Sequence, residues 1–539
     1  MKETQPPSAS RAARAETPGV SLNGWKFSPS RRWGLDRRQT AMLAGVLLLV
    51  LLAYLRSLGG GFVYDDHKEI VQNRFIGQWS FLWQSFLRDS WWFRQPNSSR
   101  PSASYYRPLQ NAWFALNYHL FGLNPLLWHA AKIALLLGTV ALCFRAAQLL
   151  TNDVGVALLS ALWFGLLPTT AEVVAWLSAV PEPLTAFFEL SIVCYLVRRP
   201  LITWRAWAMP LLLFGCALLS WDAAVIFPVL VGAYFFLLAP EDAPRRRILA
   251  LWRPLPFVLV ALAYLAIRFA AMGPVGYYNG PSAENSHSFA QVLATAPEVL
   301  ACYLKLPAEP WAIGPASTAK WVYSFASAGF YLPAAALLVL AAAAWFAIQS
   351  SPRRSLYLFC GSWFLLQLVP ALNLPSIIAL TQNRYLYVAS FGWCLALADL
   401  LVRFSRRGRV ARGLTTCLVT AVSALYAIVL WNAQGYWKDD IAMYRRAVAQ
   451  APNSPRYHEE LALQLEGRGN LKAAEREYEE LVRLQPDKGL YHYYLYMVEE
   501  RLGHIGRANE EYVRSLPPSL VPAPPGTDQP RPQSTPGAP

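Results

Sequence analysis

Long apolar segments separated by short polar loops fill most of the chain. The first, residues 40–58, has roughly the 20 residues that a helix needs to cross a bilayer. The run 289–306 is interrupted by Pro297 and Glu298 and fits a re-entrant or interfacial helix. The pattern predicts an all-α, polytopic membrane protein with about eleven transmembrane helices. The further spans are expected near residues 126–148, 154–168, 183–198, 206–220, 223–239, 255–272, 330–348, 356–372, 385–403 and 412–431.

A polar segment, residues 59–125, separates the first two spans and is much longer than the other connections. Within it, Tyr106-Arg107-Pro108 precedes LQNAWFALNYHLFG, in which apolar residues recur at helical spacing. We expect an amphipathic helix here that lies on the membrane surface.

The C-terminal part of the chain repeats with a period of 34 residues. Pro452 and Pro486 have this spacing, and small residues recur where two helices would cross. This period is typical of tetratricopeptide repeats, in which each helical hairpin buries its apolar face on the next one. The matched positions are Tyr457, His458, Leu461, Gly469, Leu471, Ala474 and Tyr478, which recur as Tyr491, His492, Leu495, Gly503, Ile505, Ala508 and Tyr512.

These patterns divide the chain into four parts. Residues 1–39 form a basic tail and residues 517–539 a Pro-rich tail, and both compositions are typical of disorder. Residues 40–432 form the transmembrane domain, with 59–125 as its large outer loop. Residues 433–516 form an α-solenoid of tetratricopeptide repeats.

The basic residues are distributed as expected for a membrane protein, in the loops between apolar segments. The chain is 55% hydrophobic and 15% charged, with a net charge of +15. In a soluble protein this charge would favour a nucleic-acid partner, but here Lys and Arg gather between apolar segments. We therefore expect membrane lipids as surroundings and no nucleic-acid partner. The positive-inside rule predicts an integral protein of the inner or plasma membrane, with a cytoplasmic N-terminus and extracytoplasmic repeats.

The first candidate for chemistry is Asp65-Asp66-His67, which follows the first span. A carboxylate can remove the proton of an acceptor hydroxyl, so Asp65 and Asp66 are candidate catalytic residues. Together with His67, the pair is also a candidate site for a divalent cation. His67 is in addition a candidate substrate-binding residue. The alternative is a hydrated turn or helix cap outside the membrane.

Other polar residues share the predicted outer face. Arg384, beside Tyr385, is suited to grip a phosphate, with an interfacial anchor as the alternative. Glu172, Glu182 and Asp222 lie in outer turns, where capping or solvation is the alternative to substrate binding. The predicted topology places all of these side chains on the outer face of the membrane, but it does not predict that they meet in one site.

The order of the motifs resembles the transmembrane and tetratricopeptide-repeat-containing (TMTC) family and its bacterial relatives, over roughly residues 40–516. That resemblance implies a GT-C glycosyltransferase fold and, for the eukaryotic members, O-mannosyl transfer from dolichyl-phosphate mannose. It maps the acidic pair of the family onto Asp65 and Asp66, and a late Arg onto Arg384. The motifs are Asp65-Asp66-His67, Tyr106-Arg107-Pro108-Leu109, Phe121-Gly122-Leu123-Asn124-Pro125 with His129, Pro168 with Glu172-Val173-Val174-Ala175-Trp176, Pro370-Ala371-Leu372-Asn373-Leu374 and Arg384-Tyr385-Leu386-Tyr387.

The chain departs from the family at positions on the presumed phosphate side. Leu167 stands where the family has His, and Trp221-Asp222 replaces Lys-Glu. The segment Ala179-Val180-Pro181-Glu182 lacks the Arg that the family has there. The chain thus has fewer basic groups on this side than the family pattern.

The leading hypothesis is a membrane glycosyltransferase that moves a sugar from a polyprenyl-phosphate donor to a protein or other acceptor outside the cytoplasm. Its repeats would bind a protein partner or acceptor. The alternative is an inactive membrane scaffold whose repeats recruit partners, which the missing basic residues favour. A transporter is less favoured, because neither mid-span charges nor inverted repeats are evident.

Overall fold

The chain folds almost entirely into helices. A computed structural model describes residues 35–96, 105–198, 204–239, 243–272, 287–317, 319–372 and 380–517. Within these ranges there is no strand, which confirms the prediction of an all-α protein. Of the two predicted tails, residues 1–34 and 518–539 lie outside the described residues.

Every apolar segment expected to cross the membrane is a helix. In the described part of the chain, seven helical segments are long and apolar enough to span a bilayer, which confirms a polytopic membrane protein. Three further apolar helices, α5, α8 and α9, are shorter. The predicted spans correspond to α1 (Arg37–Tyr54), α4 (Pro125–Thr151), α5 (Val154–Leu166), α7 (Pro181–Arg198), α8 (Trp204–Ser220), α9 (Phe227–Leu237), α11 (Leu255–Met272), α13 (Ala328–Gln349), α14 (Arg354–Leu368), α15 (Leu386–Ser405) and α16 (Arg409–Gln434).

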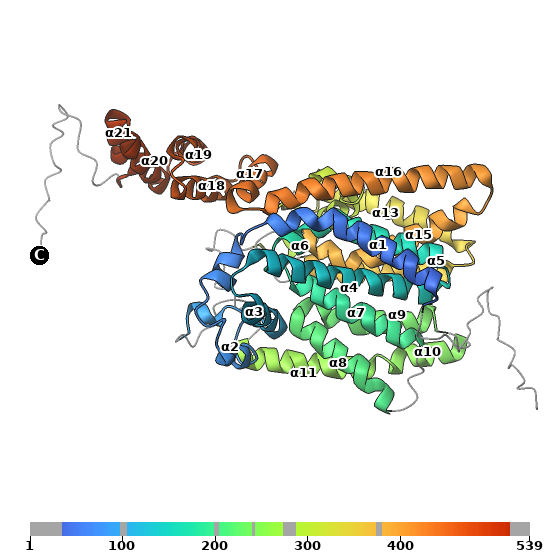
Figure 1. Ribbon diagram of the computed structural model, residues 1–539. Helices are drawn as coiled ribbons and strands as arrows, with labels where there is room; N and C mark the ends of the chain where they lie inside the picture. The colour runs from blue at the N-terminus through green and yellow to red at the C-terminus, as the bar shows by residue number, and fades with distance from the viewer. Residues whose placement is uncertain are drawn as a thin grey trace, which may run out of the picture.

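The spans pack as a bundle around α4, α5, α7 and α15, which carry much of the buried apolar core (Figure 1). Gly392 of α15 allows close packing, because a Cβ there would lie 2.4 Å from the Cys360 carbonyl oxygen. Helix α13 has no buried residue. Its apolar side chains therefore require lipid or another apolar surface around the bundle.

Two helices match the expectations for non-spanning segments. Helix α12 (Phe289–Lys305) begins with a capping box between Ser288 and Gln291 and is not among the candidate spans. Helix α3 (Pro108–Phe121) buries Phe114 and Ala115 and leaves Leu116 and Leu120 exposed. This two-sided character is that of an interfacial helix.

The connections that carry the candidate residues lie at one end of the bundle (Figure 1). Helices α2 (Trp79–Ser85), α3 and the short α6 (Thr170–Ala175) lie there, and the repeats leave from the same end after α16. Helix α10 (Ala243–Trp252) lies at the opposite end. The large loop and the repeats are thus on the same side of the bundle.

The repeats form antiparallel helical hairpins. The same internal histidine contact occurs in both repeats, 34 residues apart. His458 bonds to Glu477 (2.7 Å) and to the Pro452 carbonyl (2.8 Å). One period later, His492 bonds to Glu511 (2.5 Å) and to the Pro486 carbonyl (2.8 Å). The helices are α17 (Asp440–Gln450), α18 (Pro455–Gly467), α19 (Leu471–Leu484), α20 (Gly489–Leu502) and α21 (Ile505–Ser515).

Candidate active site

A polar pocket lies where the large loop, the α6–α7 connection and the start of α15 meet; we call it the Asp65 pocket. It contains about 520 Å³ of space not filled by protein atoms, part of it open to solvent. Aromatic rings, carboxylates and two guanidinium groups line it, which are the groups that bind sugars and phosphates. The lining residues are Asp65, Glu69, Ser90, Trp91, Tyr105, Arg107, Gln110, Trp176, Ser178, Ala179, Pro181, Glu182, Arg384 and Tyr385.

The two adjacent aspartates have different surroundings. Asp66 is fully buried, and both of its carboxylate oxygens accept hydrogen bonds. Oδ1 accepts from the Ser178 amide (2.7 Å) and hydroxyl (2.6 Å), and Oδ2 accepts from the Val63 amide (3.0 Å). Burial raises the pKa of Asp66 to about 6, while these hydrogen bonds oppose the shift. This geometry is that of a carboxylate that holds two loops together.

Asp65 faces the pocket instead. It is half-buried and makes no hydrogen bond or ion pair with any residue that the structure describes. Burial raises the pKa of its carboxyl above the ordinary value, and the charges of Lys68 and Arg384 oppose this rise. Of the predicted pair, Asp65 therefore has the carboxylate that is free to take a proton from a ligand.

Glu69 is a lining residue that the sequence interpretation missed. It follows Asp65 by four residues, on the π-helical turn His67–Val71. The Trp91 indole donates to Oε1, and the Gln110 amide donates to Oε2 at 3.1 Å. Burial, and then the charge of Asp65, raise the pKa of Glu69 to about 8. Both carboxyl groups therefore hold a proton more readily than carboxyl groups in water do, because they are buried and because each charge opposes the other.

Arg384 is fixed by two of the predicted carboxylates. Its Nη1 bonds to Glu172 Oε1 at 2.8 Å, and its Nε lies 3.2 Å from Glu182 Oε1. The guanidinium also lies over the rings of Trp176 (4.8 Å) and Tyr385 (5.3 Å). The structure therefore brings together Glu172, Glu182, Arg384 and Tyr385, although their elements are far apart in the sequence.

Arg107 is a second cation that the site predictions did not include. It lies just before α3, over the Tyr105 ring (4.4 Å), and 3.6 Å from Asp222. Its Nε is buried, and no hydrogen-bond partner for it exists among the described residues. The protein thus leaves one N–H donor of a pocket-lining residue without an acceptor among the described residues. Arg107 also connects Asp222, which does not line the pocket, to the site.

The predicted metal set Asp65, Asp66 and His67 does not converge. Both Asp66 oxygens are engaged by the protein, and the His67 ring donates through Nε2 to Asp440 at 2.8 Å. Since a divalent cation needs several free oxygen or nitrogen atoms around one point, these three residues do not fit it. The predicted substrate-binding role of His67 is not favoured either, because the ring faces Asp440.

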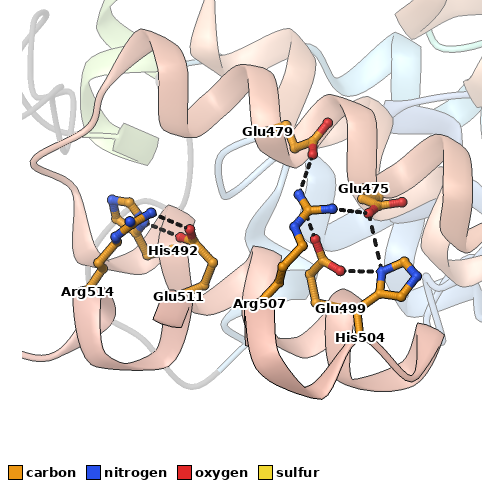
Figure 2. Close-up of polar contacts among 8 residues, drawn as sticks. All are labelled: Glu475, Glu479, His492, Glu499, His504, Arg507, Glu511 and Arg514. Atoms are coloured by element: carbon orange, nitrogen blue, oxygen red, sulfur yellow. Dashed lines mark hydrogen bonds and ion pairs between the residues drawn. The ribbon is translucent and has the colours of Figure 1, made fainter. Parts of the chain in front are cut away.

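A convergent set lies in the repeats instead: the ligand atoms of Glu475, Glu499 and His504 lie within 4.8 Å of one another. Figure 2 shows that Arg507 reaches the same carboxylates, with Nη1 3.3 Å from Glu475 and Nη2 2.9 Å from Glu499. The guanidinium of Arg507 therefore already balances the negative charge of this cluster, and the cluster is a network of salt bridges.

Comparisons with known proteins find relatives along most of the chain. A protein O-mannosyl-transferase of Caenorhabditis elegans is 23% identical over 481 residues, which cover 85% of this chain and 65% of the relative. The mouse protein O-mannosyl-transferase TMTC3 is 23% identical over 513 residues, covering 88% of this chain and 55% of the relative. The chain is thus similar to the TMTC proteins over most of its length. Over a shorter stretch of 212 residues, 38% of this chain, it is 32% identical to the Tmtc1 protein O-mannosyl-transferase of Drosophila melanogaster and covers 24% of it.

The resemblance to the TMTC family that the motif order predicted is thereby confirmed. The TMTC-like chain spans less than two thirds of the length of these curated relatives. No family model matches the chain. No solved structure matches it either.

Proposed function

We propose that this TMTC-like protein is a membrane glycosyltransferase that moves a sugar, mannose by the names of its relatives, onto a protein hydroxyl. The donor would be a polyprenyl-phosphate sugar, and the reaction would take place on the extracytoplasmic face. The observation that carries the proposal is the Asp65 pocket, which is lined both by a carboxylate without a partner and by Arg107, whose Nε has no acceptor among the described residues. The basic loops at the other end of the bundle support the orientation.

In the proposed reaction, Asp65 takes the proton of the acceptor hydroxyl while the hydroxyl oxygen attacks the anomeric carbon of the sugar. The bond between this carbon and the phosphate oxygen breaks, and the phosphate leaves with the bonding electrons. A protonated Glu69 adds no second negative charge beside Asp65, so Asp65 can be ionised, as a general base must be.

The leaving phosphate gains negative charge, so a cation must stabilise it. Arg107 is the better candidate for direct contact, because its buried Nε lacks a partner among the described residues. Arg384 has its Nη1 and Nε on Glu172 and Glu182, and would contribute its charge from a fixed position. Arg107 would thus take over the role of the basic groups that the chain lacks relative to its family.

Replacement of Asp65 by Asn tests the proposal. The substitution keeps the size of the side chain and removes the base, and general-base catalysis contributes about a hundredfold to ten-thousandfold in rate. We expect transfer of radiolabelled mannose from polyprenyl-phosphate mannose to membrane proteins to fall by about that factor. Asp487→Asn, on the exposed surface of the repeats, is the matched control. Wild-type transfer by the Asp65 variant would refute the role of Asp65 as the base, and no transfer by the wild-type protein itself would favour the inactive scaffold.

A further inference from the structure

The first repeat helix reaches into the loop that carries Asp65. The carboxylate of Asp440, at the start of α17, accepts a hydrogen bond from the Tyr64 amide on Oδ1 (2.8 Å). Its Oδ2 accepts from His67 Nε2 (2.8 Å). One buried side chain therefore holds the residue before Asp65 and the second residue after it.

The backbone that Asp440 holds has an unusual conformation. Tyr64 has φ +57°, in the left-handed region that L-residues with a bulky side chain rarely adopt. Such a conformation persists only where the surroundings fix it, and it is found mostly at functional sites. The hydrogen bond from the Tyr64 amide to Asp440 is one of these restraints, and it lies one residue from the proposed base.

Asp440 is not needed as the cap of its own helix. The N-cap of α17 is Asp439, whose carboxylate accepts from the Ala442 amide at 2.8 Å. Adjacent aspartates thus have separate tasks: Asp439 caps the start of the helix, and Asp440 binds the loop. This division provides a matched control within the same helical turn.

Helix α17 is fixed to the membrane domain near both of its ends. In the turn Gly435–Trp437 just before the helix, Trp437 stacks on Trp176 with ring centroids 5.5 Å apart, and Trp176 lines the pocket. In the second half of the helix, Arg446 donates to the Trp311 carbonyl (2.7 Å) and Gln450 donates to the Ala312 carbonyl (2.8 Å). Because the helix is held before its start and near its end, it can serve as a rigid support for the loop.

We infer that Asp440 is a positioning residue for Asp65, so that the first repeat helix completes the active site. The inference rests on the proposed function, in which Asp65 is the base. Asp440 touches no reacting atom. It acts by keeping Asp65 turned toward the pocket, while Ser178 holds Asp66 from the other side.

The test compares Asp440→Ala with Asp439→Ala in the full-length protein in lipid nanodiscs. Since misplacement of a catalytic group by about 1 Å costs on the order of a hundredfold in rate, we expect kcat of Asp440→Ala to fall about ten- to a hundredfold. KM for polyprenyl-phosphate mannose should stay within about twofold, because the groups that bind the donor are intact. Asp439→Ala loses a helix cap and some thermal stability, yet should keep its kcat within about twofold.

A double variant tests whether the two loop contacts act as a unit. His67→Ala should lower kcat, and His67→Ala with Asp440→Ala should be no slower than Asp440→Ala alone, since both remove the same restraint. Multiplied effects would overturn the inference. So would a wild-type kcat in Asp440→Ala, or an equal loss of kcat in Asp439→Ala.

Hydrogen exchange of the Tyr64 amide separates this inference from the proposed function. We expect faster exchange in Asp440→Ala than in wild type or Asp439→Ala, because the amide loses its acceptor. Unchanged exchange would overturn the restraint itself. If the wild-type protein transfers no sugar from any polyprenyl-phosphate donor while the exchange changes as expected, the proposed function fails and the restraint stands without a catalytic role.

Discussion

Arg384 allows a test that separates its structural role from its catalytic one. The guanidinium contacts the carboxylates of Glu172 and Glu182, whose side chains are 5% and 1% exposed. Replacement of Arg384 by Gln removes the charge and leaves both carboxylates buried. No other Lys or Arg in the described part of the chain forms an ion pair with either of them.

The magnitude follows from this burial. Removal of one partner of a buried ion pair costs about 3–5 kcal/mol, because a buried charge remains uncompensated. Two carboxylates are affected here, so we expect the upper half of that range for Arg384→Gln. The triple variant Arg384→Gln, Glu172→Gln, Glu182→Gln has neither the cation nor the two charges. It should regain most of the lost stability.

The assay is thermal unfolding of the purified protein in nanodiscs, paired with the sugar-transfer assay. Under the proposed function, Arg384→Gln loses both stability and transfer, and the triple variant recovers only stability. Two results would refute the reasoning: a stability loss of under about 1 kcal/mol in Arg384→Gln, which is the range of exposed pairs, or no recovery in the triple variant.

Two further predictions concern the loop and the repeats. The folded pKa of Glu69 (about 8) exceeds the ordinary pKa of a glutamate, 4.5. The stability that its neutral carboxyl contributes is therefore complete below pH 4.5 and is lost as the pH rises through 8. Thermal unfolding between pH 5 and 9 should therefore show this loss in the wild-type protein and not in Glu69→Gln. The control is Glu309→Gln, which replaces an exposed carboxylate and should behave as the wild type. In the repeats, His492→Ala removes the bonds to Glu511 and the Pro486 carbonyl, and we expect a loss of about 1–3 kcal/mol in unfolding free energy. An unchanged melting temperature would mean that this contact, shared by both repeats, adds no stability.

Much of the fold could be predicted from the sequence, because apolar length and a 34-residue period are local signals. The apolar segments correspond to helices, and the period recurs in the contacts of His458 and His492. The distribution of basic residues between the spans predicted that Asp65 and Arg384 lie on the same face of the membrane, and both residues line the same pocket.

The remaining parts of the site depend on contacts that no local pattern encodes. Adjacent residues on a helical turn face different sides, so Asp65 and Asp66 could not share one task. The same rule would have suggested Glu69, four residues after Asp65. The link between His67 and Asp440 joins residues 373 positions apart. Arg107 was visible only as part of a motif, and its free Nε depends on the packing around α3.

The apolar cluster that includes Val63, Trp176 and Trp437 continues into the core of the repeats. It sets a limit on how such proteins can diversify. Hairpins can be added or lost beyond α18 without any change to the loop that carries Asp65. Exchange of the whole array between relatives would instead cut through a shared interior, and the graft would have to restore both the stacked tryptophans and a carboxylate at position 440. The part of the array that can be exchanged without disturbing this loop therefore begins after α18, and not at the membrane surface.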